Sequence, residues 1–216
     1  MIIVETQAVA PFFKNGFVVA CPRTRDGVLI DPGDEVDGLL TFAERERVTL
    51  GHILLTHAHV DHITGVGAAK RALNVPVHLH QDDLFLYQRA VQQGAMFGVR
   101  VDPPPPVDTF YAPGQAIRFG DFEVRPHHTP GHCPGGVCLQ VGRPGEPGMD
   151  LFVGDTLFAG SIGRTDLPGG DHATLLSTIR TVLFAFGDEA RVYPGHGPAT
   201  TIGQERRTNP FLQAAP

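Results

Sequence analysis

The stretch Thr56-His57-Ala58-His59-Val60-Asp61-His62 concentrates three histidines and an aspartate directly after an apolar run, residues 52–55 (HILL). That run has the length and composition of a buried strand. Side chains alternate along an extended segment, so His57 and His59 point the same way and can hold one metal ion. We therefore expect a metal centre at the end of this strand.

Helical spacing returns over residues 63–73, where Ile63 and Val66 begin an inner apolar stripe. The chain therefore turns into a helix that opens at Asp61, which directs Asp61 and His62 away from the first pair. These two side chains are candidates for a second metal ion. A strand before the cluster and a helix after it argue against a purely structural role for so many metal-binding residue types.

Two metal ions need more ligands than one segment supplies, and three further polar clusters each follow an apolar run of strand length. Polar groups on short glycine-rich loops at strand ends can converge at one edge of a sheet. The predicted ligands are His57, His59 and His132 for metal 1, Asp61, His62 and His196 for metal 2, and Asp155 shared between them. Nitrogen and oxygen ligands without a thiolate suit two divalent ions, Zn(II) first, with Fe(II) or Mn(II) as alternatives.

Strand-like and helix-like stretches alternate along the whole chain, which predicts an α+β fold. Strands followed by mixed strands and helices, twice over, suit a four-layer αββα sandwich with helices outside two sheets, formed as a single domain over residues 1–216. The expected strands are 2–5, 16–20, 28–30, 52–55, 75–80, 122–125, 137–141, 151–153 and, as the last, 191–193. The main expected helices are 34–47, 63–73, one after Asp82 or Asp83, and 171–187 with Asp171 as its N-cap.

The composition limits the classes of partner. The formal net charge of −6 argues against nucleic acid or an anionic membrane as the main partner. We see no secretory signal and no apolar run long enough to span a membrane. An odd number of cysteines, 3, without a CxxC pair favours a reducing compartment. We expect a soluble cytoplasmic protein, a monomer or homodimer, that acts on a small molecule.

The other histidines are expected to be surface or strand residues. His127 and His128 are the exceptions, because they lie close to His132 in the sequence and are candidates to support the site. Cys133 follows a predicted ligand but is expected to be a small packed residue rather than a nucleophile.

The motifs H-x-H-x-D-H, G-H, G-D and P-G-H, in this order, resemble those of the metallo-β-lactamase superfamily, and the resemblance extends over nearly the whole chain. Residues 154–171 (GDTLFAGSIGRTDLPGGD) and 193–212 (YPGHGPATTIGQERRTNPFL) resemble the glyoxalase II group, especially its short bacterial members. The resemblance implies a hydroxyacylglutathione hydrolase that cleaves a thioester such as S-lactoylglutathione or another S-acylglutathione. Attack would come from a hydroxide that bridges the two ions, with Asp155 as the bridging ligand and Asp61 orienting the hydroxide.

Two departures from that group concern the thiol. The long glyoxalase II enzymes have an additional C-terminal helical domain that helps to bind glutathione, and the few residues after His196 do not provide one. Those enzymes also place a lysine and a tyrosine after the bridging aspartate, where this chain has Arg164 and Asp166. Arg164 can still bind a substrate carboxylate, whereas Asp166 cannot replace a tyrosine.

Two alternatives remain open. The segments 61–65 (DHITG) and 163–166 (GRTD) resemble the persulfide dioxygenases, which implies a single Fe(II) held by His57, His132 and Asp155 and oxidation of glutathione persulfide. The P-G-H-G and N-P-F-L segments are closer to the hydrolases and favour hydrolysis. A non-catalytic metal-binding protein is the second alternative, and it is disfavoured because every predicted ligand is present.

Overall fold

A computed structural model describes residues 1–213 and contains two six-stranded sheets. The first sheet consists, in order across it, of β1 (Ile3–Gln7), β2 (Gly16–Ala20), β3 (Asp26–Ile30), β4 (Thr49–Leu54), β5 (Val77–Leu79) and β6 (Thr109–Phe110). Its first three strands are antiparallel, and β3 to β6 run parallel. The carboxyl ends of β3 and β4 therefore reach the same edge.

The second sheet consists, in order, of β14 (Thr200–Thr201), β13 (Arg191–Pro194), β10 (Asp150–Gly154), β9 (Val137–Gly142), β8 (Phe122–His128) and β7 (Ile117–Phe119). Strands β10 and β13 are parallel, so their carboxyl ends also lie together. A separate hairpin pairs β11 (Leu157–Phe158) with β12 (Ser161–Ile162).

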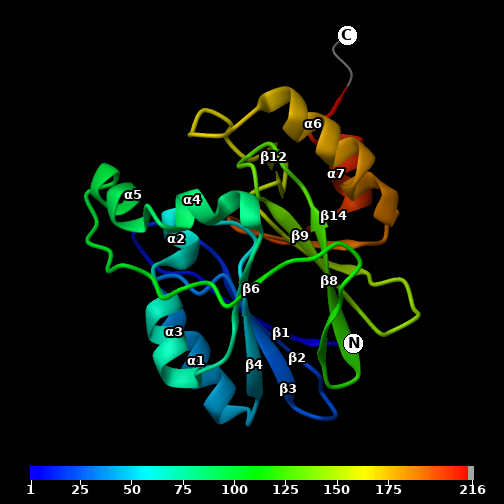
Figure 1. Cartoon of the computed structure of the whole chain (residues 1–216). Helices are drawn as coiled ribbons and strands as arrows, with labels where there is room; N and C mark the ends of the chain where they lie inside the picture. The colour runs from blue at the N-terminus through cyan, green and yellow to red at the C-terminus, as the bar shows by residue number, and fades with distance from the viewer. Residues whose placement is uncertain (214–216) are drawn as a thin grey trace.

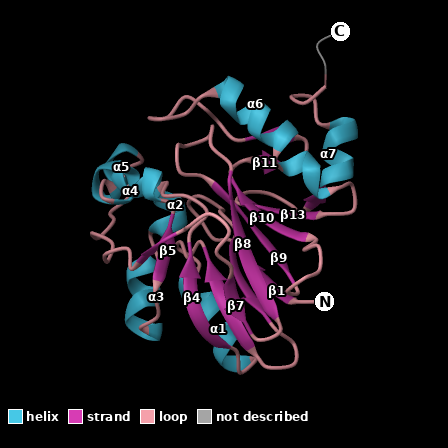
Figure 2. Cartoon of the chain, turned by 45° about the vertical axis from the view of Figure 1, so that its right-hand side comes forward, coloured by secondary structure: helices cyan, strands magenta, loops and turns pink. Residues whose placement is uncertain are grey.

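Helices cover the outer face of each sheet (Figures 1 and 2). On the first sheet lie α1 (Val36–Arg45), α2 (Val60–Ile63), α3 (Val66–Leu73), η1 (Gln81–Asp83), α4 (Leu84–Tyr87) and α5 (Ala90–Met96). On the second lie α6 (His172–Thr181), η2 (Leu183–Phe186) and α7 (Ile202–Thr208). The predicted α+β sandwich of four layers is confirmed.

Three apolar cores hold these layers together because side chains alternate between the faces of each strand. Phe17 and Val19 of β2 face Leu139 and Phe152 of the second sheet, whereas Val18 faces the outer helices. The outer cores contain Leu39 and Ala69 on one side, and Leu175, Ile179 and Ile202 on the other. Among residues 1–213, no helix is long and apolar enough to cross a membrane.

The helix boundaries differ from the sequence-based expectation at three places. The helix expected over 63–73 is interrupted, because α2 ends at Ile63 and α3 starts at Val66. Gly65 lies between them, and a side chain there would collide with the Gly33 carbonyl at 2.2 Å. The helix expected after Asp82 or Asp83 is likewise divided into α4 and α5, and the one expected over 171–187 ends as α6 at Thr181 before η2. The Asp171 N-cap is confirmed, since its carboxylate accepts a hydrogen bond from Thr174 N at 2.7 Å.

Candidate metal centre

Three of the predicted ligands gather in a first group at the sheet edge. Donor atoms of His57, His59 and His132 all lie within 4.8 Å of one another. His59 Nδ1 and His132 Nε2 are 2.7 Å apart, and the rings of His57 and His59 are 4.9 Å apart between centroids. The prediction that His57 and His59 point the same way is therefore confirmed. Convergent, buried imidazole nitrogens are a geometry that suits a divalent metal ion.

The second group lies beside the first. Donor atoms of Asp61, His62 and His196 are also within 4.8 Å of one another, and His196 Nε2 is 3.1 Å from Asp61 Oδ2. Asp61 and His62 are carried by α2, whereas His196 follows β13. The expectation that His62 is directed away from the first pair is wrong, because its ring centroid lies 4.0 Å from that of His57, closer than the 4.9 Å between His57 and His59.

Asp155 lies between the two groups. Its Oδ2 is 3.7 Å from His132 Nε2 in the first group and 3.6 Å from His196 Nε2 in the second. Its Oδ1 is 3.3 Å from His62 Nε2. One carboxylate can therefore contact an ion in either group, which is the position required of a bridging ligand.

Glycines make this close approach possible. A side chain at Gly195 would lie 2.2 Å from Asp155 Oδ1 and 2.7 Å from His62 Cε1. Gly154 has a φ of +51° and faces Thr56, which a side chain would meet at 2.4 Å. Glycine tolerates this left-handed backbone and leaves room for the neighbouring strand. The glycines of the G-D and P-G-H motifs thus bring Asp155 and His196 to the histidine cluster.

Asp31 is a residue of the cluster that the sequence did not mark as a candidate. It follows β3 and is buried, and its Oδ2 accepts hydrogen bonds from His62 Nδ1 at 2.9 Å and Thr56 Oγ1 at 2.5 Å. Its Oδ1 accepts from Thr56 N at 2.7 Å. The bond from His62 Nδ1–H fixes the tautomer that leaves Nε2 free for a metal. Its place at the end of another strand was the available signal, but the sequence Asp31-Pro32-Gly33 suggests only a turn.

Asp83 is the second residue that was missed. Its side chain is buried, and it accepts hydrogen bonds from Ala58 N at 2.9 Å and Gly135 N at 2.6 Å. Ala58 lies between the first two histidines, and Gly135 lies on the loop of His132. Asp83 therefore ties together the two loops that form the first group. No sequence motif marks this role, because Asp83 resembles an ordinary helix cap.

The charges of the cluster favour a bound cation. Burial would lower the pKa of His62, but the carboxylates of Asp61, Asp155 and Asp31 raise the pKa of His62 to about 10. Burial alone would raise the pKa of Asp155, yet His62, His132 and the other imidazoles lower it. Three carboxylates around one histidine thus require positive charge, which a proton supplies when no metal ion does.

The first group behaves differently, because its histidines are buried beside one another. Burial and the neighbouring His132 lower the pKa of His59 to about 3, and burial also lowers the pKa of His57 far below its ordinary value. Neutral imidazole is the form that binds metal ions. His57 and His59 therefore offer neutral nitrogen ligands at physiological pH.

Unpaired buried atoms provide an independent test of whether a metal fits. His57 Nε2, His62 Nε2 and Asp155 Oδ1 are buried and have no hydrogen-bond partner within residues 1–213. Buried polar atoms are normally paired, and leaving them unpaired costs about 1–3 kcal/mol each. These atoms belong to the predicted ligands, so the residues fit two divalent metal ions.

Arg164, the predicted substrate-binding residue, lies at the rim of the cluster. Its carbonyl oxygen accepts a hydrogen bond from His132 Nδ1 at 2.7 Å, which leaves His132 Nε2 directed at Asp155. Its guanidinium is exposed and forms an ion pair with Asp166 at 2.6 Å. The side chain therefore lies outside the metal cluster and is accessible to a carboxylate from solvent.

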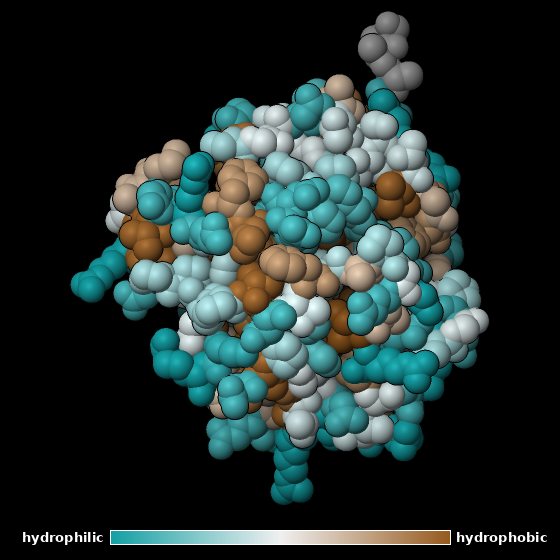
Figure 3. All heavy atoms as spheres, viewed as in Figure 1, coloured by the Kyte–Doolittle hydropathy of each residue, from teal (hydrophilic) through white to brown (hydrophobic). Residues whose placement is uncertain are grey.

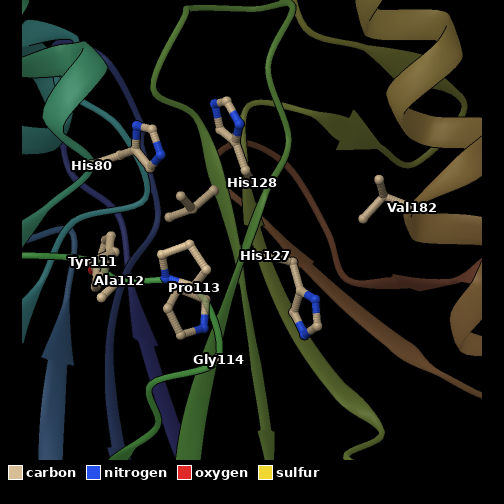
Figure 4. Close-up of a pocket in the computed structure, with 10 residues that line it drawn as sticks. His80, Tyr111, Ala112, Pro113, Gly114, His127, His128 and Val182 are labelled. Atoms are coloured by element: carbon tan, nitrogen blue, oxygen red, sulfur yellow. The ribbon is translucent and has the colours of Figure 1, made fainter.

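His127 and His128 do not join the two groups. His127 contacts Gln140 at 2.8 Å, and His128 bonds to the carbonyl of Pro134 at 2.8 Å. Figure 4 shows His128 turned toward His80, with His127 directed away from both, and the rings of His80 and His128 stack at 4.2 Å. They line a separate pocket of about 350 Å³. Of the contacts expected to support the metal site, these two histidines make only the hydrogen bond between His128 and the Pro134 carbonyl, on the loop that carries His132.

Comparison with known proteins identifies related sequences. The sequence model of the metallo-beta-lactamase superfamily matches residues 9–196. The chain is 37% identical over 192 residues to hydroxyacylglutathione hydrolase GloC of Haemophilus influenzae, which covers 88% of this chain and 89% of that protein. It is 36% identical to the probable metallo-hydrolase YqgX of Bacillus subtilis, over 86% of each chain.

Solved structures agree with these relatives. BLEG-1 B3 metallo-beta-lactamase has a TM-score of 0.88 at 36% identity, covering 98% of this chain and 100% of its own. TTHA1623, solved in a di-iron-bound form, has a TM-score of 0.84 at 41% identity, covering 97% and 100%. ETHE1 from Myxococcus xanthus has a TM-score of 0.78 at 27% identity, covering 96% and 83%.

Proposed function

This chain belongs to the metallo-beta-lactamase superfamily, and from that membership and the metal centre we propose that it is a metal-dependent hydrolase of thioesters. The substrate that we propose is an S-acylglutathione, of which S-lactoylglutathione is one example. The hydroxyacylglutathione hydrolase of Haemophilus influenzae, at 37% identity, supports this assignment. Two relatives are named hydrolases, whereas hydrolysis of a thioester and the identity of its thiol are our proposal.

The position of Asp155 carries the proposal. Its two oxygens approach nitrogens of both histidine groups at distances of 3.3–3.7 Å. Two divalent ions, when bound, supply a hydroxide at neutral pH and stabilise negative charge on the attacked carbonyl oxygen. We propose Asp155 as the ligand shared by both ions.

The residues of the chain have distinct tasks in this proposal. His57, His59 and His132 would hold one ion, and Asp61, His62 and His196 would hold the other. The carboxylate of Asp61, 3.1 Å from His196 Nε2, would also accept a hydrogen bond from the attacking water. In the reaction a C–O bond forms, the C–S bond breaks, and the products are a carboxylic acid and a thiol. A thiolate is a good leaving group, since a thiol pKa is about 8.5, so little general-acid help is needed.

The substrate's thiol half would lie near Arg164. Its guanidinium is exposed at the rim of the site, and its partner Asp166 is also exposed. An exposed ion pair contributes little, about 0–1 kcal/mol, so a substrate carboxylate can displace Asp166 at small cost. Arg164 would then bind a glutathione carboxylate in the place of the lysine found in the long enzymes.

The metals themselves are part of the proposal. Zn(II) is our first choice for a centre of nitrogen and oxygen ligands, and Fe(II) is supported by the di-iron form of TTHA1623, a relative at 41% identity. The same ligands bind Mn(II) more weakly.

A persulfide dioxygenase is the second candidate, because His57, His132 and Asp155 gather in one site and two histidines with one carboxylate suit a single Fe(II). The second group of ligands has no task in that reaction. The hydrolase gives Asp61, His62 and His196 a role, and we therefore favour it.

One preparation tests both candidates. The protein is loaded with Zn(II) or Fe(II), and thiol release from S-lactoylglutathione and S-acetylglutathione is followed beside oxygen uptake with glutathione persulfide. A β-lactam serves as a third substrate, because one similar structure is named a B3 metallo-beta-lactamase. We expect thiol release without oxygen uptake. Persulfide-dependent oxygen uptake would favour the dioxygenase, and metal binding without turnover of any substrate would favour a non-catalytic protein.

A further inference from the structure

An apolar pocket opens beside the first metal group. It has a volume of about 310 Å³ and is lined by the apolar residues Leu86, Met96, Phe97, Leu167 and Pro168, by His59, and by the polar residues Arg89, Gln92 and Gln93. Its walls are α4 and α5 on one side and the loop before α6 on the other, which lie near each other in Figures 1 and 2. We call it the α5 pocket.

The α5 pocket adjoins the site at His59. The ring of this histidine belongs to the first metal group, where its Nδ1 is 2.7 Å from His132 Nε2, and it also forms part of the pocket wall. A group attached to the carbonyl carbon that reacts at the metals can therefore extend directly into the pocket.

Gln93 fixes the pocket to the metal-binding loop. Its side-chain nitrogen donates to the carbonyl oxygens of Ala58 at 3.0 Å and Leu86 at 2.8 Å, and its oxygen accepts from Val60 N at 3.2 Å. Ala58 and Val60 flank His59, so α5 is tied directly to the backbone beside this ligand. The pocket is thus pre-formed, and a ligand need not order it on binding.

The walls of the pocket are mainly hydrocarbon. Met96 and Phe97 remain 71% and 46% exposed at the mouth, although both are large apolar side chains. Figure 3 shows hydrophobic residues at the surface over α5. When an apolar part of a substrate covers exposed apolar surface beside a reaction centre, the burial of that surface makes the binding free energy more favourable.

We propose that the α5 pocket binds the acyl group of the thioester, and that this group is a hydrocarbon chain longer than lactoyl. This inference rests on the proposed S-acylglutathione hydrolysis. The glutathione half carries two carboxylates and an ammonium group, which are costly to transfer into an apolar pocket. The acyl half carries no charge. Lactoyl has three carbons and a hydroxyl group, so it neither fills a pocket of about 310 Å³ nor matches its lining.

The assignment leaves the polar half at the rim. Leu167 lines the pocket, while Arg164 of the same loop has an exposed guanidinium. One loop thus presents an apolar side chain to the acyl chain and a cation to the glutathione carboxylates. The acyl and thiol halves would diverge from the metals toward these two places.

A substrate series tests the proposal. We expect kcat/KM to rise about fourfold for each methylene added from S-acetyl- through S-butanoyl- to S-hexanoylglutathione, since burying one methylene contributes about 0.8 kcal/mol. S-hexanoylglutathione should exceed S-lactoylglutathione by more than tenfold. A profile that is flat or falls with chain length would overturn the proposal while leaving thioester hydrolysis intact. If no thioester is hydrolysed, the proposed function fails and this inference fails with it.

Two variants place the effect in the α5 pocket. Leu167→Glu and Met96→Glu each introduce a charge into the lining, and each should lower the ratio of kcat/KM for S-hexanoylglutathione to that for S-acetylglutathione to about one. Val91→Glu is the matched control, since Val91 is also an α5 residue, is 43% exposed and is not among the lining residues of the α5 pocket. Retained chain-length preference in both pocket variants would refute the site. The site would also be refuted if, at a constant acyl group, a change of the thiol altered kcat/KM as much as the change of acyl chain does.

Discussion

Replacing Asp31 by asparagine should weaken metal binding at the second group without changing the size of the side chain. Asp31 accepts hydrogen bonds from Thr56 N at 2.7 Å, Thr56 Oγ1 at 2.5 Å and His62 Nδ1 at 2.9 Å. The asparagine oxygen can still accept the hydrogen bond from Thr56 N, and its NH₂ group then replaces Oδ2, which faces Thr56 Oγ1 and His62 Nδ1. The Thr56 hydroxyl can rotate to accept from this group. His62 Nδ1 must then accept as well, so the hydrogen of the neutral ring moves to Nε2.

The magnitude follows from the bond that is lost. The bond from His62 to the Asp31 carboxylate is charge-assisted and worth about 1.5–3 kcal/mol. Each 1.4 kcal/mol corresponds to about tenfold in affinity, so metal affinity at the second group should fall about 10- to 100-fold, the range typical for loss of a partner that orients a ligand. The first group should lose less affinity than the second, because Asp31 acts on it only through Thr56, whose Oγ1 is 3.1 Å from His57 Nδ1.

Competition with a chromogenic chelator measures the two affinities separately. Asp34→Asn is the control, since it is the same substitution three residues away at an exposed position. Equal metal affinities in wild-type protein and the Asp31→Asn variant would refute the orienting role. Loss of both ions to the same extent would show that Asp31 supports the fold of the whole site instead.

Three further predictions concern stability and protonation. Asp83→Asn should lower the free energy of unfolding by about 1–3 kcal/mol, because the backbone N–H of either Ala58 or Gly135 loses its hydrogen-bond acceptor. Chemical denaturation measures this with Asp82→Asn as the control, and an unchanged stability would contradict the prediction. Metal binding to the metal-free protein near pH 8 should release about two protons, one from His62, whose pKa is about 10 without metal, and one from the water that becomes the hydroxide. Calorimetry in buffers of different ionisation enthalpy measures this, and release of one proton or none would contradict it. Burial and His52 lower the pKa of His78 to about 4 in the folded protein. As the pH falls from 6.5 to about 4, the unfolded chain therefore protonates His78 while the folded protein does not, and the free energy of unfolding decreases. His78→Leu should reduce this decrease in denaturation curves, and an identical pH dependence would exclude His78 as its source.

The strand-end pattern explains why much of the site could be predicted from the sequence. His57, His132, Asp155 and His196 each follow an apolar strand, and parallel strands bring their carboxyl ends to one edge. Short-range spacing and sheet geometry are therefore sufficient to group the ligands. Their roles as metal ligands stay predictions until metal binding is measured.

The residues that were missed depend on contacts between distant segments. Asp83 acts through Ala58 and Gly135, which lie 25 and 52 residues away in the chain. Gln93 likewise reaches the backbone around His59 from α5. Such side chains carry no local signature, because their partners are backbone groups that any residue provides.

The predicted boundaries of helices and strands were wrong where the elements are short or interrupted. β14 contains two residues and α7 follows it at once, so neither has enough periodicity to be recognised, and β13 was wrongly expected to be the last strand. The break between α2 and α3 comes from the packing of Gly65 against Gly33, a tertiary contact that helical spacing does not reveal. The layers were nevertheless predictable, because they depend on alternation within the longer strands.

Metal titration of the metal-free protein tests the central claim most directly. Thiol release from an S-acylglutathione is measured after each addition of Zn(II) or Fe(II), with oxygen uptake followed in parallel. We predict that turnover rises to a plateau at about two metal equivalents per chain, without oxygen uptake, and that Asp155→Ala abolishes it. A plateau at about one equivalent of iron with persulfide-dependent oxygen uptake, or turnover that persists in Asp155→Ala, would contradict the two-metal hydrolase.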